Sequence, residues 1–207
     1  MTNDATWSSG TGALLALAIG AFGIGTTEFS PMGLLPVIAE GVDVSIPTAG
    51  MLISAYAVGV MIGAPVMTLL FSRFGKRTAL MALMGIFTIG NLLSALAPDY
   101  WTLLAARVVT SLNHGAFFGL GAVVAASVVP KEKQASAVAI MFMGLTIANI
   151  AGVPLAGILG QGLGWRWGFA LPGVLALIAG WLILKLAPRV GVDKNARPLD
   201  ELKALGN

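Results

Sequence analysis

Glu28 and Arg107 are two charged residues that stand well inside long apolar stretches of the sequence. A charge deep in hydrocarbon costs about 2.5–3.5 kcal/mol or more, so neither side chain is expected to face lipid. At about 1.5 Å per residue, Glu28 lies roughly 15 Å and Arg107 roughly 9 Å from the outer end of its own helix. These similar depths predict a shared, water-filled interior, in which the carboxylate can take up a proton and the guanidinium can hold an anionic group.

Arg107 also begins a polar stripe along its predicted helix. Thr110, Ser111 and His114 follow it at spacings i+3, i+4 and i+7, so the four side chains share one helical face. Asn113 borders this face. A continuous polar stripe in a membrane helix is typical of a wall that lines water or a solute. We therefore expect this helix to line a central cavity, where Thr110, Asn113 and His114 supply hydrogen bonds to a solute.

Other roles are open to the same residues. Glu28 and Arg107 can form a buried ion pair that only fixes helix packing, and His114 can be a neutral, hydrogen-bonded helix residue. Ser111 and His114 lie one turn apart, as in a hydrolase, but the sequence has no glycine-flanked serine elbow and no evident oxyanion donors. With no cysteine and one histidine, the chain has no thiol chemistry and no multi-histidine metal site. We predict no enzyme, no cofactor and no metal.

The elements that position these residues are apolar helices. Hydrophobic residues make up 57% of the chain and charged residues 10%, against roughly a quarter charged in soluble domains. The mean hydropathy of +0.89 likewise indicates that lipid is the solvent for most side chains. Six runs are long enough to cross a bilayer, and the short joints between them require antiparallel neighbours. We expect an all-α membrane bundle over residues 1–188, with helices at approximately 13–38, 49–71, 78–97, 101–128, 135–159 and 167–186.

The basic residues predict the orientation of the bundle. If the N-terminus is in the cytoplasm, Arg166 is the one basic residue in the outer connections, which also hold the acidic residues Glu40, Asp43 and Asp99. The sequence therefore predicts a multi-pass protein of the cell inner membrane with both termini cytoplasmic, the polar tail at 189–207 included. A net charge of +3 spread over short connections does not indicate a nucleic-acid partner. The inner side would hold Arg73, Lys76, Arg77, Lys131, Lys133, Lys185, Arg189, Lys194, Arg197 and Lys203.

Two predicted helices carry small residues four apart, which permits a second helix to approach closely. Two interpretations are open: the stripes pack inside this bundle, or they face a partner bundle that the chain does not contain. The stripes are Gly144, Ala148, Gly152, Ala156 and Gly160 in one helix, and Ala55, Gly59 and Gly63 in the other.

Four segments together resemble a known family. Residues 26–36, Thr-Thr-Glu-Phe-Ser-Pro-Met-Gly-Leu-Leu-Pro, resemble the first-helix signature of the drug:proton antiporter group of the major facilitator superfamily. Arg107 matches the arginine of the fourth-helix signature. The connection at 72–77 matches the cytoplasmic loop signature at Arg73, Gly75, Lys76 and Arg77, but has Thr68 for the usual glycine and Ser72 for the usual aspartate. The fifth-helix antiporter signature is matched by Gly144, Gly152, Pro154 and Gly157.

This resemblance covers almost the whole chain and extends, more distantly, to arabinose-efflux and chloramphenicol-resistance permeases. It implies the N-terminal six helices of a twelve-helix fold, built as a 3+3 inverted repeat, with the tail starting the connection between halves. It also implies proton-coupled efflux of a small organic solute by alternating access, with the fifth helix facing the other half. The partners are then the bilayer, the solute, protons and a missing C-terminal half. A half-size protein that acts as a homodimer or a channel-like pore is the alternative.

Overall fold

The computed structural model describes residues 3–190, and the regular structure in this range is helical. Six spans in this range are long and apolar enough to cross a membrane, which confirms the predicted all-α fold. The predicted tail at 189–207 falls, beyond Val190, outside the described residues. The elements are α1 (Asn3–Gly41), α2 (Ile46–Phe71), α3 (Lys76–Leu96), α4 (Tyr100–Ser111), α5 (His114–Ser127), a 3-10 turn (Lys131–Lys133), α6 (Gln134–Ile147), a π-helical turn (Ala148–Gly152), α7 (Val153–Leu163) and α8 (Trp167–Leu186).

Capping residues set the start of two spans. The Ser45 hydroxyl accepts a 3.2 Å hydrogen bond from the backbone N–H of Thr48, with Pro47 in the first turn of α2. Asp99 and Thr102 form a capping box at the start of α4, with the Thr102 N–H donating to Asp99 Oδ1 at 2.9 Å. This backbone hydrogen bond holds the pKa of Asp99 below its usual range. The ionised cap is therefore fully formed at neutral pH and is lost only as the pH falls through that lowered pKa.

The helix predicted at 101–128 is interrupted, which corrects the prediction of one continuous element. It divides into α4 and α5, and the break has a local cause. The Ser111 hydroxyl donates to the Val108 carbonyl at 2.7 Å, while the Leu112 N–H bonds the Val109 carbonyl instead, three residues back. A serine that bonds the backbone of its own helix competes with the regular ladder and bends it. The polar stripe therefore does not run along one straight helix.

The helix predicted at 135–159 also differs from a regular helix. It continues to Leu163 and contains a π-helical turn at Ala148–Gly152, directly before Pro154. Proline has no N–H and its ring crowds the carbonyl four residues earlier, here that of Ile150. A π-turn at this place widens the helix where the regular hydrogen bond is missing.

The first span is longer than predicted at both ends. It runs from Asn3 to Gly41 rather than over 13–38, and it contains Pro31 and Pro36 without ending at either. Prolines are tolerated in membrane helices where neighbouring helices support the freed backbone. The other three predicted helices agree with the structure within three residues at each end.

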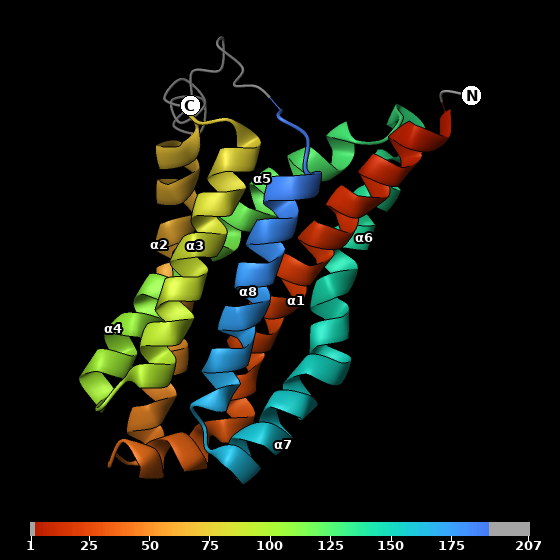
Figure 1. Ribbon diagram of the computed structural model, residues 1–207. Helices are drawn as coiled ribbons and strands as arrows, with labels where there is room; N and C mark the ends of the chain where they lie inside the picture. Colours follow the sequence, from red (N-terminus) through yellow and green to blue (C-terminus); the bar gives the residue numbers. More distant parts are fainter. Residues whose placement is uncertain (1–2, 191–207) are drawn as a thin grey trace.

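The spans run antiparallel, so the start of α1 and the end of α8 lie at the same end of the bundle, called the terminal end below (Figure 1). This terminal end also holds the α2–α3 connection and the start of α6, whereas α4 begins at the opposite end. A backbone hydrogen bond of 3.2 Å from Lys76 N–H to the Val190 carbonyl ties the start of α3 to the last described residue. Helix α1 packs against α8 and α6, and α3 packs against α8 and α4.

Two apolar clusters are separated by a buried polar layer. The cluster near the terminal end includes Ile24, Phe87 and Phe117, and the cluster near the opposite end includes Leu34 and Phe169. In α1, in α3 and along the α4–α5 span, the buried polar residues fall between the residues of the two clusters, so they form one layer at mid-height. Its members are Thr26, Thr27, Ser30, Thr88, Asn91, Ser94, Arg107, Thr110, Ser111 and Asn113.

The small-residue stripe of α6 and α7 packs inside the bundle, which decides between the two interpretations for this helix. A Cβ added at three of its glycines would collide with α1, because the two helices approach closely there. The colliding pairs are Gly144 with Ala18, Gly152 with Thr26, and Gly160 with Leu34. By contrast, Pro154 is exposed and a Cβ at Gly157 would meet nothing within 4 Å.

The small-residue stripe of α2 packs in the same way. A Cβ at Gly59 would meet Ser111, and one at Gly63 would meet Leu112. Both glycines are buried, so their role is to bring α2 close to the break between α4 and α5. The exposed apolar side chains of these spans are larger residues, such as Met61 of α2, Met143 of α6 and Ile158 of α7.

Gly144→Ala is expected to destabilise the folded bundle, because the new methyl group would meet the Ala18 backbone carbonyl, which cannot move without shifting α1. Overpacking of this kind costs about 1–3 kcal/mol. Gly157→Ala is the matched control: its methyl group has open space, and alanine favours a helix by up to about 1 kcal/mol. Thermal unfolding of the two variants in detergent should therefore move in opposite directions or leave Gly157→Ala unchanged. Equal losses of stability would contradict the close α1 contact.

Candidate functional site

Glu28 and His114 form the accessible part of the site. Glu28 lies on α1 and His114 is the first residue of α5, directly after the break that Ser111 causes. Glu28 Oε2 lies 3.9 Å from His114 Nε2, and the two side chains are 27% and 14% exposed. The carboxylate therefore sits on a face that water or a solute can reach, although it is in the middle of its span.

Tyr56 connects this pair to Arg107. Its hydroxyl lies 3.2 Å from His114 Nδ1, and its ring centroid lies 4.2 Å from the guanidinium carbon of Arg107. The guanidinium is also 5.4 Å from the Phe169 ring centroid. Aromatic faces attract a cation, most strongly where both are removed from water. The order of contacts is therefore carboxylate, imidazole, phenol, guanidinium and phenyl ring, drawn from α1, α5, α2, α4 and α8.

Arg107 is buried without a conventional partner. Its side chain is 1% exposed, and none of its three guanidinium nitrogens has a hydrogen bond among the described residues. Glu28 is near enough for its charge to act on Arg107, but within residues 3–190 the basic nitrogen that lies within 4 Å of its carboxylate belongs to His114, which is charged only when protonated. Glu28 and Arg107 therefore do not form the direct ion pair that was one of the two interpretations of the sequence. Buried polar groups normally have partners, so this guanidinium is an exception that requires a reason.

Two further polar side chains in the layer share this property. The Asn113 amide is fully buried at the α4–α5 break, and neither its nitrogen nor its oxygen has a partner in the described part of the chain. The Ser30 hydroxyl, two residues after Glu28, is also buried and unpartnered there. Such groups are commonly bridged by internal water.

Thr110 is not brought to the site, contrary to the prediction that it supplies a hydrogen bond to a solute. Its hydroxyl donates to the Ala106 carbonyl at 2.8 Å, and its side chain is fully buried where α4 meets Gly90 of α3. Arg107 begins on the same helix but has a long side chain, which reaches the rings of α2 and α8. Helical spacing alone could not show that the Thr110 side chain faces α3 whereas the Arg107 side chain reaches α2 and α8.

Tyr56 and the Thr27–Asn91 hydrogen bond were not identified from the sequence as parts of the site. Tyr56 lies in an apolar helix, where an aromatic residue is ordinarily read as packing. Thr27 Oγ1 donates to Asn91 Oδ1 at 2.9 Å, which joins α1 to α3 one residue before Glu28 and fixes the rotation of α1. The available signal was a larger polar side chain in each apolar run, the Tyr56 phenol and the Asn91 amide.

The loop motif at 72–77 contacts the end of α8 rather than the site. Gly75 precedes the first residue of α3, and Arg77 donates to the Leu184 carbonyl in the last turn of α8. Ser72, in the place of the family's aspartate, donates to the Leu69 carbonyl of its own helix at 2.7 Å. Exposed Arg73 and the Lys76 backbone lie at the same end. Arg77 thus helps to cap the end of α8.

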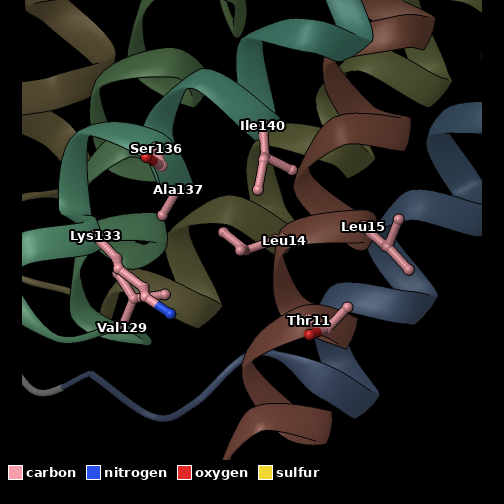
Figure 2. A pocket seen from close by; sticks show the side chains of 8 residues that line it. All are labelled: Thr11, Leu14, Leu15, Val129, Lys133, Ser136, Ala137 and Ile140. Carbon is pink, nitrogen blue, oxygen red and sulfur yellow. The ribbon is translucent and has the colours of Figure 1, made fainter.

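Two other hollows among the described residues do not include Glu28, Tyr56, Arg107 or His114 in their linings. A slot of about 160 Å³ separates α1 from α6 at the terminal end; Figure 2 shows Leu14, Leu15 and Ile140 along it and Lys133 beside Val129. It lies roughly 20 Å along α1 from Glu28. A larger apolar groove, of about 710 Å³, runs between α2 and α4 on the opposite half of the bundle. Within the described residues, no group of three or more acidic or histidine side chains is placed to hold a metal ion.

Comparisons with known proteins agree with this architecture. Residues 17–205 match the family described as Major Facilitator Superfamily. The chain is 67% identical over 192 residues to the inner membrane transport protein YdhP of Escherichia coli strain K12, covering 93% of this chain and 49% of YdhP. It is 37% identical over 175 residues to a chloramphenicol resistance protein of Streptomyces lividans, covering 84% of this chain and 45% of that protein.

Solved structures show the same fold. The proton:xylose symporter XylE superposes with a TM-score of 0.79 at 16% identity, over 89% of this chain and 46% of XylE. The chain spans about half the length of the curated relatives and of the solved transporters that it matches.

Proposed function

Because this chain belongs to the Major Facilitator Superfamily, a family of membrane transporters and not of enzymes, we propose that it forms one half of a proton-coupled exporter. The solute would be a small organic molecule, carried out of the cell by alternating access as protons move in. The single observation that carries this proposal is the Glu28–His114 pair, partly exposed at mid-span with Arg107 buried behind it.

Glu28 is the residue that we assign to the proton. A carboxylate at mid-span is tolerable if it can exchange protons with a wet cavity, and its neighbours here are an imidazole and a nearby guanidinium. When Glu28 is ionised, it is attracted to the Arg107 side of the site; when it is protonated, that attraction is lost. A change of protonation therefore alters the balance of charges between α1 and α4, and this is a physical basis for switching the cavity between the two sides.

A second six-helix unit is part of this proposal. The curated relatives are about twice as long as the chain, and α2 and the α6–α7 span are the least buried spans within the described bundle. The large side chains on these spans, together with the apolar groove between α2 and α4, form a surface suited to another apolar bundle. We propose that a C-terminal six-helix half occupies it, with a second copy of this chain as the alternative. Hereafter, the assembled transporter means this chain together with that second unit.

The proposed location is the cell inner membrane with both termini in the cytoplasm. The similarity to an inner membrane transport protein supports the location, and the basic residues at the terminal end support the orientation. Relatives named for chloramphenicol resistance and for probable sugar efflux support export of small organic solutes. Their names point to different solutes, so the proposal stays at this class.

The test is a proteoliposome assay of the assembled transporter with an imposed pH gradient. Candidate solutes, including sugars and chloramphenicol, are added one at a time while solute flux and internal pH are recorded. The expected result is saturable flux of at least one solute, coupled to an opposite proton flux. Saturable flux that leaves the pH unchanged would overturn proton coupling, and a non-saturating conductance would favour a pore instead. The stoichiometry of the active complex, measured by mass photometry, distinguishes a longer chain from two copies.

A further inference from the structure

Tyr56 is the only residue described above that contacts both His114 and Arg107. It is 3% exposed, and its two contacts use different parts of the side chain: the hydroxyl meets the imidazole and the ring face meets the guanidinium. The rings of Tyr56 and His114 are nearly perpendicular, at 79°, so the phenol meets the imidazole at an edge instead of stacking on it. This edge-on arrangement places the Tyr56 hydroxyl 3.2 Å from His114 Nδ1, within hydrogen-bond distance.

We infer that Tyr56 is a positioning residue that selects the tautomer of His114 and aims its Nε2–H at Glu28. The phenolic hydroxyl has one proton, and within the described residues its partner is His114 Nδ1. If the hydroxyl donates that proton, Nδ1 must be the bare nitrogen, and the neutral imidazole then carries its hydrogen on Nε2. The hydrogen bond at one ring nitrogen sets the state of the other in this way. Nε2 is the atom that lies 3.9 Å from the Glu28 carboxylate.

The surroundings of His114 favour this arrangement. Glu28 of α1 faces Nε2, and an N–H directed at a carboxylate is favoured over a bare nitrogen lone pair there. On the other side, Arg107 of α4 lies behind the Tyr56 ring, and its positive charge favours the electron-rich face of that ring. The remaining ring neighbour is Phe118, with its centroid 5.2 Å away, which stacks in turn on Phe142 of α6 and offers no polar atom.

The consequence for transport follows from the proposed function and rests on it. Each time Glu28 gains or loses its proton, the imidazole must present the same nitrogen if the pair is to respond in the same way. Tyr56 supplies that constancy without touching the solute. Its loss should therefore slow turnover more than it weakens solute binding.

The first test uses the fact that the chain has one histidine, so a ¹⁵N-histidine label reports on His114 alone. In the purified chain in lipid nanodiscs at neutral pH, the ¹⁵N shifts should show a protonated Nε2 and a bare, hydrogen-bonded Nδ1. Tyr56→Phe removes the hydroxyl but keeps the ring on Arg107, and it should yield a mixture of tautomers. Tyr100→Phe is the matched control, since Tyr100 is the other tyrosine of the chain and belongs to the apolar cluster at the opposite end.

This arm does not depend on transport and can overturn the inference by itself. A protonated Nδ1 in the wild-type chain contradicts the assignment before any variant is made. An unchanged single tautomer in Tyr56→Phe also contradicts it, because another group would then be orienting the imidazole. The thermal midpoint of Tyr56→Phe, compared with that of Tyr100→Phe, checks that the fold is retained.

The second test measures the assembled transporter. Tyr56→Phe should lower kcat by about five- to tenfold, the equivalent of one hydrogen bond, and change the shape of the pH–rate profile with little change in KM. Tyr100→Phe, which lies outside the contacts among Glu28, His114 and Arg107, should leave the shape of the pH–rate profile unchanged. Unaltered kcat and pH profile in Tyr56→Phe, with the tautomer lost in the first test, would refute the role in transport. A wild-type assembly with no proton-coupled flux would refute the proposed function instead and leave the tautomer assignment intact.

Discussion

Replacing Glu28 by glutamine is expected to abolish proton-coupled export while the bundle remains folded. Glutamine has nearly the same shape but cannot take up or release a proton at this position. Its amide can still contact His114 Nε2, and the side chain at this position is partly exposed. The expected loss of proton-driven flux is comparable to the loss of a general base, on the order of a hundredfold.

The design of this test depends on separating solute movement from proton movement. Solute exchange across the assembled transporter without a pH gradient should persist in Glu28→Gln, because the cavity and the solute contacts are retained. Glu40→Gln is the matched control on the same helix: Glu40 is exposed at the far end of α1, and its replacement should leave proton-driven export intact. Proton-driven export at the wild-type rate in Glu28→Gln would remove this carboxylate from the mechanism.

The spans were predictable from the sequence because hydropathy and length are properties of each segment by itself. The interruptions were not predicted, because they depend on single hydrogen bonds. The Ser111 hydroxyl captures a backbone carbonyl and ends α4, and Pro154 removes an N–H and produces the π-turn. Neither event changes the hydropathy of its run, so the runs at 101–128 and 135–159 read as continuous helices.

The site was predicted in part, for a reason that concerns side-chain length. Depth along a helix placed Glu28 and Arg107 at a similar level, and the structure brings both near His114 and Tyr56. Spacing also placed Thr110 beside them, but its short side chain contacts only the neighbouring helix α3 and does not reach the site. The glycine stripes were likewise predicted only in part. Periodicity identifies a smooth face on each helix, but the packed bundle is needed to show that α1 covers the stripe of α6 and α7 and that the end of α4 covers the stripe of α2.

Replacing Arg107 by methionine is expected to separate stability from function. The guanidinium is fully buried without a hydrogen bond among the described residues, and its compensation is limited to aromatic faces and the nearby charge of Glu28. Replacing buried charges by apolar side chains of similar size is often neutral or stabilising, by about 1–4 kcal/mol. Arg107→Met should therefore unfold at the wild-type temperature or above it, and yet lose proton-coupled export.

Arg166→Met supplies the contrast that makes this result interpretable. The Arg166 guanidinium also lies over an aromatic ring, 4.3 Å from the Trp165 centroid, but it donates to the Ala97 carbonyl at 2.9 Å and its residue is exposed. Its replacement should lower stability by about 1 kcal/mol through the lost hydrogen bond and leave transport nearly unchanged.

Stability that is unchanged or raised in Arg107→Met but lowered in Arg166→Met would show that the buried cation at Arg107 serves transport rather than folding. Thermal unfolding in detergent and flux in proteoliposomes measure the two quantities on the same preparations. A clear fall in the unfolding temperature of Arg107→Met would mean that the ring contacts outweigh the cost of burying the charge, and that Arg107 is a packing residue. Retained proton-coupled export in Arg107→Met would show that Arg107 has no role in transport, since a methionine can neither attract Glu28 nor respond to its protonation.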